Sequence, residues 1–132
     1  MQIIRKPESS KEWEDYYHLR WEILRAPLNL DKGSEKDDLE DSATHRAVFD
    51  NEKIVGIGRL HFIDKNKAQI RYMAILEDYR GKGLGRMIVE EFAQISEQNK
   101  IFKIILYARE SVIEFYKKLD FEIIKKAHRL EN

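Results

Sequence analysis

The sequence predicts one α+β domain over residues 1–132, with a mixed, mostly antiparallel sheet flanked by helices. Two stretches carry apolar residues at helical spacing, and strand-like alternating stretches lie between them. A glycine-rich turn, Arg80 to Gly85, separates an extended apolar run from the second helical stretch. A chain of 132 residues can bury a single core without disulfides. These observations favour a single domain with an α+β plan.

The amino-terminal residues predict a short strand followed by a helix. Gln2 to Arg5 is the strand, and Ser9 or Ser10 caps the helix, which Pro27 ends. The apolar stripe of this helix consists of Trp13, Tyr16, Tyr17, Ile23 and Leu24. Arg20 lies on the same stripe, so its guanidinium either reaches an anion or a cavity, or extends along the surface to solvent.

The middle of the chain predicts a charged loop and then a meander of strands. Residues 29–42 are dominated by charged side chains, which is typical of a mobile loop or lid. Residues 43–50 and 53–63 alternate as a hairpin around residues 50–52, and residues 67–76 form a third strand. The glycine-rich turn follows directly.

The carboxyl-terminal part predicts a helix, a strand, a second helix and a last strand. The first helix has the stripe Leu84, Met87, Ile88, Phe92 and Ile95. Residues 102–107 are almost continuously apolar, which favours a strand buried on both faces. Residues 110–119 then read as a helix and residues 121–124 as a strand.

The glycine-rich turn has the chemistry of an anion site. The first N–H groups of a helix lack partners and carry partial positive charge, and glycine lets an anion approach the backbone. Arg80, Lys82 and Arg86 add positive charge there. A nucleoside triphosphate loop would need Ser or Thr after Lys82, and a dinucleotide loop a different glycine spacing. An ordinary strand-to-helix turn is the alternative.

Composition excludes several classes of protein. The chain has no cysteine, so a thiol nucleophile, a disulfide framework and the usual zinc sites are excluded, and no spacing favours another metal. Lys plus Arg equals Asp plus Glu, which argues against a nucleic-acid module or a membrane-surface protein. No stretch is long and apolar enough for a membrane span or secretory signal, so we expect a cytoplasmic protein.

Two segments, residues 73–85 and 108–121, resemble the GCN5-related N-acetyltransferase (GNAT) family, and the likeness extends over nearly the whole chain. Arg80, Gly83 and Gly85 match the family's Arg/Gln-x-x-Gly-x-Gly/Ala signature. The resemblance implies an acetyl-coenzyme A donor, with its pyrophosphate on the turn and its pantetheine arm paired with a bulged strand. The implied cofactor-binding residues are Met73, Ala74, Ile75, Arg80, Gly81, Lys82, Gly83, Leu84, Gly85, Arg86 and Arg109.

The resemblance also implies a catalytic acid. Tyr116 matches the family position for the group that protonates the departing thiolate; without the resemblance it reads as a core aromatic. Arg109 replaces the Asn found in many members, so it either contacts the cofactor or faces solvent. In some members a carboxylate on one of two strands acts as the general base. The corresponding residues here are Gln69 and Ile104, which cannot take a proton, so either an ordered water chain removes the proton or the amine arrives neutral.

The implied reaction is acetyl transfer to a primary amine of a small molecule. Arginines on the first helix and the sheet would suit an acceptor that also carries a carboxylate or phosphate. The candidate acceptor residues are Arg20, Trp21, Arg25, Arg59, His61 and Arg71, although a lone strand histidine is often structural. A protein or peptide acetyltransferase and a non-catalytic acyl-coenzyme A sensor are the alternatives. Family members commonly continue into a final strand, whereas this chain has eleven residues after Phe121, so either that strand is missing or a partner subunit supplies one; an unpaired sheet edge would favour a homodimer.

Overall fold

The computed structural model describes residues 2–106, which form a five-stranded mixed sheet with one helix on each face. The strands lie in chain order: β1 (Gln2–Arg5), β2 (Thr44–Asp50), β3 (Lys53–Phe62), β4 (Lys67–Ile75) and β5 (Lys103–Ile105). Neighbours from β1 to β4 are antiparallel, and β5 joins β4 in parallel. The predicted α+β class with a mostly antiparallel sheet is confirmed.

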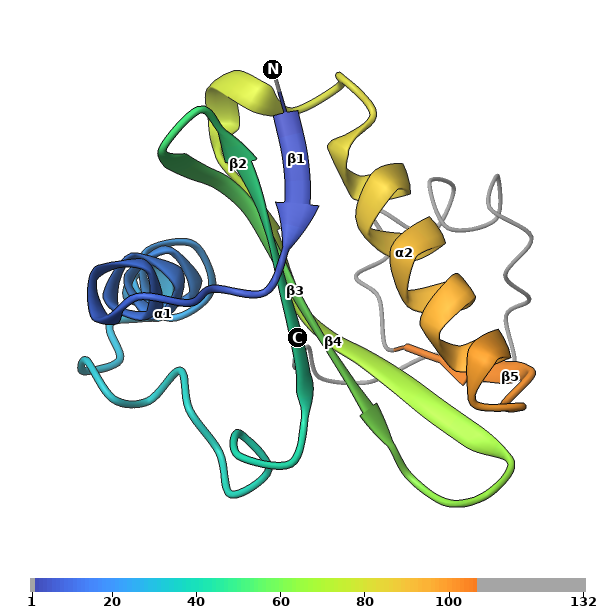
Figure 1. Cartoon of the computed structure of the whole chain (residues 1–132). Helices are drawn as coiled ribbons and strands as arrows, with labels where there is room; N and C mark the ends of the chain where they lie inside the picture. Colours follow the sequence, from blue (N-terminus) through green and yellow to red (C-terminus); the bar gives the residue numbers. More distant parts are fainter. Residues whose placement is uncertain (1, 107–132) are drawn as a thin grey trace.

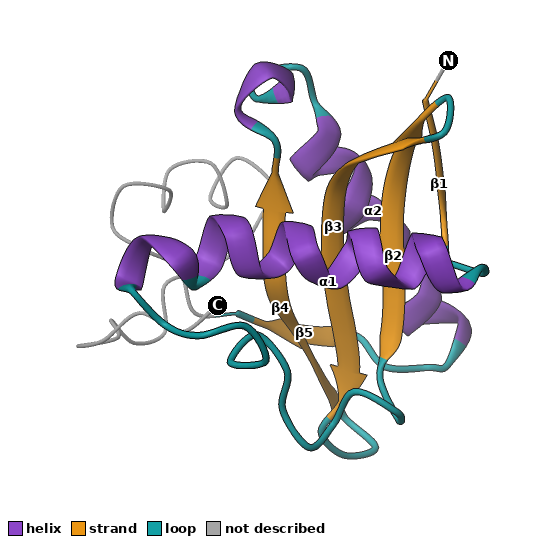
Figure 2. Cartoon of the chain, turned by 90° about the vertical axis from the view of Figure 1, so that its left-hand side faces the viewer, coloured by secondary structure: helices purple, strands orange, loops and turns teal. Residues whose placement is uncertain are grey.

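The two long helices lie on opposite faces of the sheet (Figure 1). They are α1 (Ser10–Leu24) and α2 (Leu84–Gln98), and short 3₁₀ turns follow α1 (Ala26–Leu28) and β4 (Glu77–Tyr79). Seen from the side of α1, that helix crosses the strands at a steep angle (Figure 2). Each helix covers a separate apolar cluster, one centred on Tyr16 and Phe49 and the other on Ile88 and Phe92. Neither helix is long and apolar enough to cross a bilayer, and the same holds for residues 2–106 as a whole.

A capping box fixes the start of α1. The Ser9 hydroxyl accepts the N–H of Glu12 at 3.1 Å, and the Glu12 carboxylate accepts the N–H of Ser9 at 3.4 Å. Arg5 of β1 also donates to Glu12, at 2.8 Å, and this bond lowers the pKa of Glu12 to about 2. The first helix is therefore tied to the first strand as well as to the sheet beneath it.

Helix α2 approaches the sheet closely over Gly58 of β3. A Cβ atom built on Gly58 would lie 2.8 Å from Cγ2 of Ile88 and 3.0 Å from Cε2 of Phe92. Both side chains are fully buried, so they have little room to move. This strand position thus needs the absence of a side chain, since glycine is otherwise unfavourable in a strand.

Replacing Gly58 by alanine should lower the free energy of unfolding by about 1–3 kcal/mol, because the added methyl group overpacks the α2 interface. Denaturant unfolding of the purified variant measures the change. A Gly58→Ala protein as stable as the parent would show that Ile88 and Phe92 yield freely.

Strand β5 differs from its predicted form. It spans only Lys103–Ile105, and Phe102 is 78% exposed, so the prediction of a strand buried on both faces from residue 102 is wrong. Lys103 pairs with Lys67, the first residue of β4, next to the exposed β3–β4 turn, and Ile104 packs against the α2 cluster while staying only partly buried. The predicted helix 110–119, strand 121–124, Arg109 and Tyr116 lie outside the described residues.

Candidate functional site

A bulge in β4 lies opposite Gly58 of β3. Ile57 pairs with Ala74 and Arg59 with Arg71, so Tyr72 and Met73 together face one residue of β3. Tyr72 has a φ of 58°, which is rare for a bulky residue and marks a strained position. Among residues 2–106, β4 pairs with β5 over Lys67–Gln69. The bulge thus includes Met73, the first residue of the segment that the family resemblance implies for the pantetheine arm.

The glycine-rich turn leads from β4 into α2. Gly81 and Gly83 have φ angles of 76° and 86°, and Gly83 is the N-cap of α2. Within the described chain, no acceptor lies against the backbone N–H groups of residues 81–86. The turn is exposed, and the Arg80 Nε donates to the carbonyl oxygen of Ile75 at 3.0 Å. A row of free N–H donors at a helix N-terminus fits a pyrophosphate group.

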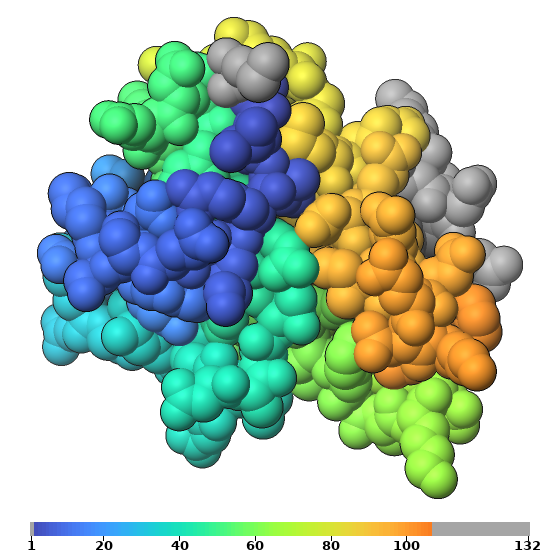
Figure 3. Space-filling view, in the orientation of Figure 1, coloured from blue at the N-terminus to red at the C-terminus, as the bar shows by residue number. Residues whose placement is uncertain are grey.

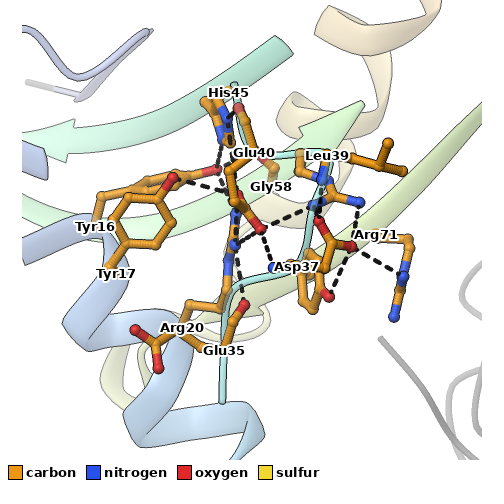
Figure 4. A network of polar contacts seen from close by, with 12 residues as sticks. Tyr16, Tyr17, Arg20, Glu35, Asp37, Leu39, Glu40, His45, Gly58 and Arg71 are labelled. Atoms are coloured by element: carbon orange, nitrogen blue, oxygen red, sulfur yellow. Dashed lines mark hydrogen bonds and ion pairs between the residues drawn. The ribbon is translucent and has the colours of Figure 1, made fainter. Parts of the chain in front are cut away.

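Two fully buried arginines lie on the opposite face of the sheet, under the loop of residues 29–43 (Figure 4). The Arg20 Nη1 donates to both carboxylate oxygens of Glu40 at 2.9 Å and to the carbonyl oxygen of Glu35 at 3.1 Å. Arg59 binds Asp37 through two bonds of 2.7 and 3.0 Å and Glu40 through a third of 2.9 Å. Of the alternatives for Arg20, the structure therefore shows a buried anion partner, not extension to solvent.

The electrostatics of this network favour the ionised carboxylates. Burial raises the pKa of Asp37, but hydrogen bonds from Arg59 and from the N–H of Leu39 outweigh it and hold that pKa well below its usual range. Charges buried this deeply are stable only as bonded pairs. The ion pairs consequently fix the charged loop to the sheet, which the composition of the loop did not predict.

Tyr16 and His45 connect the same loop to the bulged region of the sheet. The Tyr16 hydroxyl lies 2.7 Å from Nδ1 of His45 and 3.0 Å from the carbonyl oxygen of Gly58, and Nε2 of His45 lies 2.7 Å from the carbonyl oxygen of Glu40. Burial lowers the pKa of His45 and raises that of Tyr16 well above 10. Both side chains therefore stay neutral near pH 7.

The loop of residues 29–43 packs below α1 as part of one continuous surface (Figure 3).

The four arginines proposed from the sequence as candidate acceptor residues all lie close to the ring of Tyr72, a residue of the bulge. The guanidinium carbons of Arg20, Arg71, Arg59 and Arg25 lie 4.2, 4.6, 4.7 and 5.4 Å from its ring centroid. The Tyr72 hydroxyl also donates to Asp37 at 3.3 Å. This ring is therefore the centre of the polar cluster.

The other candidate acceptor residues lie at the edges of the cluster. The Trp21 Nε1 donates to the carbonyl oxygen of Leu30 at 2.9 Å, so its indole supports the loop. His61 is half-buried, and burial, with Arg59 and Arg71 nearby, lowers its pKa. Residues 2–106 hold no cluster of metal-ligating side chains.

Sequence reasoning missed Asp37 and Glu40, the two carboxylates that bind the buried arginines. One signal was present: an arginine on a buried helical stripe requires an anion, and the nearest concentration of carboxylates is the loop that follows that helix. Periodicity does not say which of these carboxylates faces the sheet.

A mixed sheet, a bulged fourth strand and an exposed glycine turn at a helix N-terminus together match the α+β architecture that the sequence predicted for an acetyltransferase. The chain belongs to the acetyltransferase (GNAT) family, whose sequence pattern matches residues 11–121, and is therefore an acetyltransferase. The uncharacterized N-acetyltransferase YjcF of Bacillus subtilis (strain 168) is 26% identical over 129 residues, which are 98% of this chain and 90% of that protein.

Solved structures show the same fold. An acetyltransferase of the GNAT family from Staphylococcus aureus Mu50 superposes with a TM-score of 0.82 at 19% identity, over 100% of this chain and 95% of that one. A predicted acetyltransferase from Clostridium acetobutylicum, solved with acetyl-coenzyme A, superposes with a TM-score of 0.72 at 18% identity, over 100% of this chain and 96% of that one. At these identities the likeness is one of fold.

Proposed function

We propose that this acetyltransferase moves the acetyl group of acetyl-coenzyme A to a primary amine of a small molecule. The observation that carries the donor is the row of N–H groups at residues 81–86, which have no partner among residues 2–106 and follow the bulged strand β4. Acetyl-coenzyme A supplies a thioester that an amine can attack directly. Residues 81–86 would hold its pyrophosphate, and the backbone of residues 73–75 its pantetheine arm.

The protein's own groups would act on charge and protons. A backbone N–H in residues 73–75 would stabilise the negative charge that develops on the acetyl oxygen. Tyr116 would donate its phenolic proton to the departing sulfur as the bond to the acetyl carbon breaks, and the proton that the nitrogen releases as the amide forms would pass to water, from which the Tyr116 phenolate would regain its own proton. Gln69 and the half-buried Ile104 of β5 cannot accept a proton, so an amine that reaches the site neutral suits this chain.

Release of free coenzyme A, detected through its thiol, tests the reaction across a panel of amines, amino acids and peptides. We expect turnover with small amines. Turnover confined to peptides would instead identify a peptide acetyltransferase. Calorimetric binding of acetyl-coenzyme A without turnover on any acceptor would identify a sensor, and no binding would contradict the proposal.

Replacing Gly83 by alanine should weaken acetyl-coenzyme A binding about tenfold or more, because its φ of 86° strains any residue with a Cβ at the proposed anion site. Isothermal titration calorimetry measures the affinity. Gly33→Ala is a matched control, since Gly33 has a φ of 104° and equally open surroundings but lies in the loop between α1 and β2. Equal cofactor affinities for the two variants would contradict the assignment of Gly83.

A further inference from the structure

Arg71 lies at the outer end of the buried ion network (Figure 4). Its positive charge is not required to neutralise the carboxylates of that network. Asp37 already receives two bonds from Arg59, at 2.7 and 3.0 Å, and Glu40 receives two from Arg20, both at 2.9 Å. Arg71 reaches only one oxygen of Asp37, at 3.4 Å. Asp37 and Glu40 are thus matched by two buried guanidiniums, whereas the carboxylate of buried Glu35 accepts the N–H of Gly33 at 2.7 Å. Arg71 is left with a single long ion pair among the described residues.

Arg25 is a second guanidinium near Tyr72 that binds no carboxylate among the described residues, and it lies 5.4 Å from the ring centroid. Its guanidinium donates to the carbonyl oxygens of Ser34 and Leu24, at 3.3 and 3.1 Å. No carboxylate of residues 2–106 lies within 4.0 Å of it. Only 20% of the Arg71 side chain is exposed, so its positive charge is partly removed from water. Removing this charge from water costs free energy. The contact between the Arg71 guanidinium and the Tyr72 ring offsets only part of that cost, and a bound anion would offset more.

The strand positions beside Arg71 provide no further carboxylate. Arg71 pairs in register with Arg59, and two residues earlier Gln69 pairs with His61. Nδ1 of His61 is buried without a hydrogen-bond partner among the described residues, and burial with nearby Arg59 and Arg71 lowers the pKa of the imidazole. His61 is consequently neutral at pH 7, so it neither adds to the positive charge of Arg71 nor offsets it.

The bulge connects Arg71 to the reaction. Because of the bulge, Arg71 and Tyr72 both face the α1 side, and Met73, where the proposed pantetheine-binding segment begins, comes only two residues after Arg71. Consecutive Cα atoms are about 3.8 Å apart, so a small molecule held by Arg71 can present an amine near that segment. The positive charge of Arg71 also favours the neutral form of a nearby amine, which the absence of a carboxylate at Gln69 and Ile104 requires.

We infer that the acceptor is an amine that also bears a carboxylate or a phosphate, and that Arg71 is the specificity-determining residue that binds this anionic group. The inference rests on the function proposed above. Arg20 and Arg59, which the sequence offered for the same role, are assigned to holding the loop of residues 29–43, and Asp37 positions the Arg71 guanidinium. Arginine suits either anion because its planar group can donate two parallel bonds.

Matched pairs of amines test this inference through binding, with and without saturating coenzyme A. The pairs are 4-aminobutyrate with 4-aminobutanamide, and phosphoethanolamine with ethanolamine. We expect the parent protein to bind at least one anionic member about tenfold or more tightly than its neutral partner, and the pair that responds tells carboxylate from phosphate. Arg71→Gln should abolish the preference, and Arg71→Lys should retain part of it.

Arg46→Gln is the matched control, because Arg46 pairs with Glu91 of α2 on the opposite face of the sheet. It should keep the full preference. Where acceptors turn over, Arg71→Gln should raise KM for the anionic member and change kcat little, with acetyl-coenzyme A affinity unchanged. No preference in the parent protein, or an undiminished preference in Arg71→Gln, would overturn the inference. A preference without any turnover would support it and count against the acetyl transfer itself.

Discussion

Replacing Glu40 by glutamine is expected to lower the free energy of unfolding by about 3–5 kcal/mol, the range for breaking a buried ion pair by removing one partner. The Glu40 carboxylate bonds to both Arg20 and Arg59, whose side chains have no exposed surface. Without it, Arg20 keeps no carboxylate partner within residues 2–106, and Arg59 keeps only Asp37. Glutamine preserves size but turns an amide group toward two guanidiniums. Urea unfolding followed by circular dichroism measures the loss.

The control for this prediction is Glu90→Gln, the same chemical change in a pair at the surface. Glu90 and its partner Arg86 have 66% and 53% of their side chains exposed and lie 3.9 Å apart. Exposed pairs contribute about 0–1 kcal/mol, so this variant should remain close to the parent. If both variants lost a similar, small amount of stability, water or another group would have to neutralise Arg20, and the network would not be the anchor of the loop.

The elements of the fold were predictable because each follows from local chemistry. The apolar stripe and Ser9 cap predict α1, and the alternation on either side of residues 50–52 predicts the β2–β3 hairpin. The strand predicted over residues 67–76 is confirmed to within one residue, since β4 spans Lys67–Ile75. These signals depend on neighbours within a few residues along the chain.

The ion network was not predictable, because it depends on contacts between distant residues. Arg20 and Glu40 are twenty residues apart, and Arg59 and Asp37 twenty-two. The left-handed conformation of Tyr72 also had no signal at its own position, since such a φ is normally announced by glycine or asparagine. Resemblance to the family supplied the expectation of a bulged strand, and the structure locates that bulge at Tyr72 and Met73.

The arrangement separates two tasks between the faces of the sheet. The N–H groups that fit the donor's pyrophosphate belong to the start of α2, whereas the arginine cluster lies on the face covered by α1. Strand β4 takes part in both sites. Its bulge directs Tyr72 toward the arginine cluster, and the chain beyond its end forms the glycine-rich turn. Donor and acceptor contacts can therefore be tested by independent substitutions.

Replacing Tyr116 by phenylalanine is expected to lower kcat by about 10²–10⁴-fold, the usual contribution of a positioned general acid. A phenol has an ordinary pKa of about 10, so it holds its proton at neutral pH and can give it to a sulfur that leaves as a thiolate. Phenylalanine keeps the ring, so the affinity for acetyl-coenzyme A should stay unchanged. Stopped-flow detection of the coenzyme A thiol and calorimetry of the cofactor provide the two measurements.

Tyr79→Phe is the control for this loss of a phenolic hydroxyl. The Tyr79 hydroxyl donates to Asp50 of β2 at 2.7 Å, a contact within the scaffold, so kcat should change little. A Tyr116→Phe protein with the kcat of the parent would remove Tyr116 from the mechanism and require the sulfur to take its proton from water or from the amine. A parallel loss of kcat and cofactor affinity would instead assign Tyr116 a role in holding the donor.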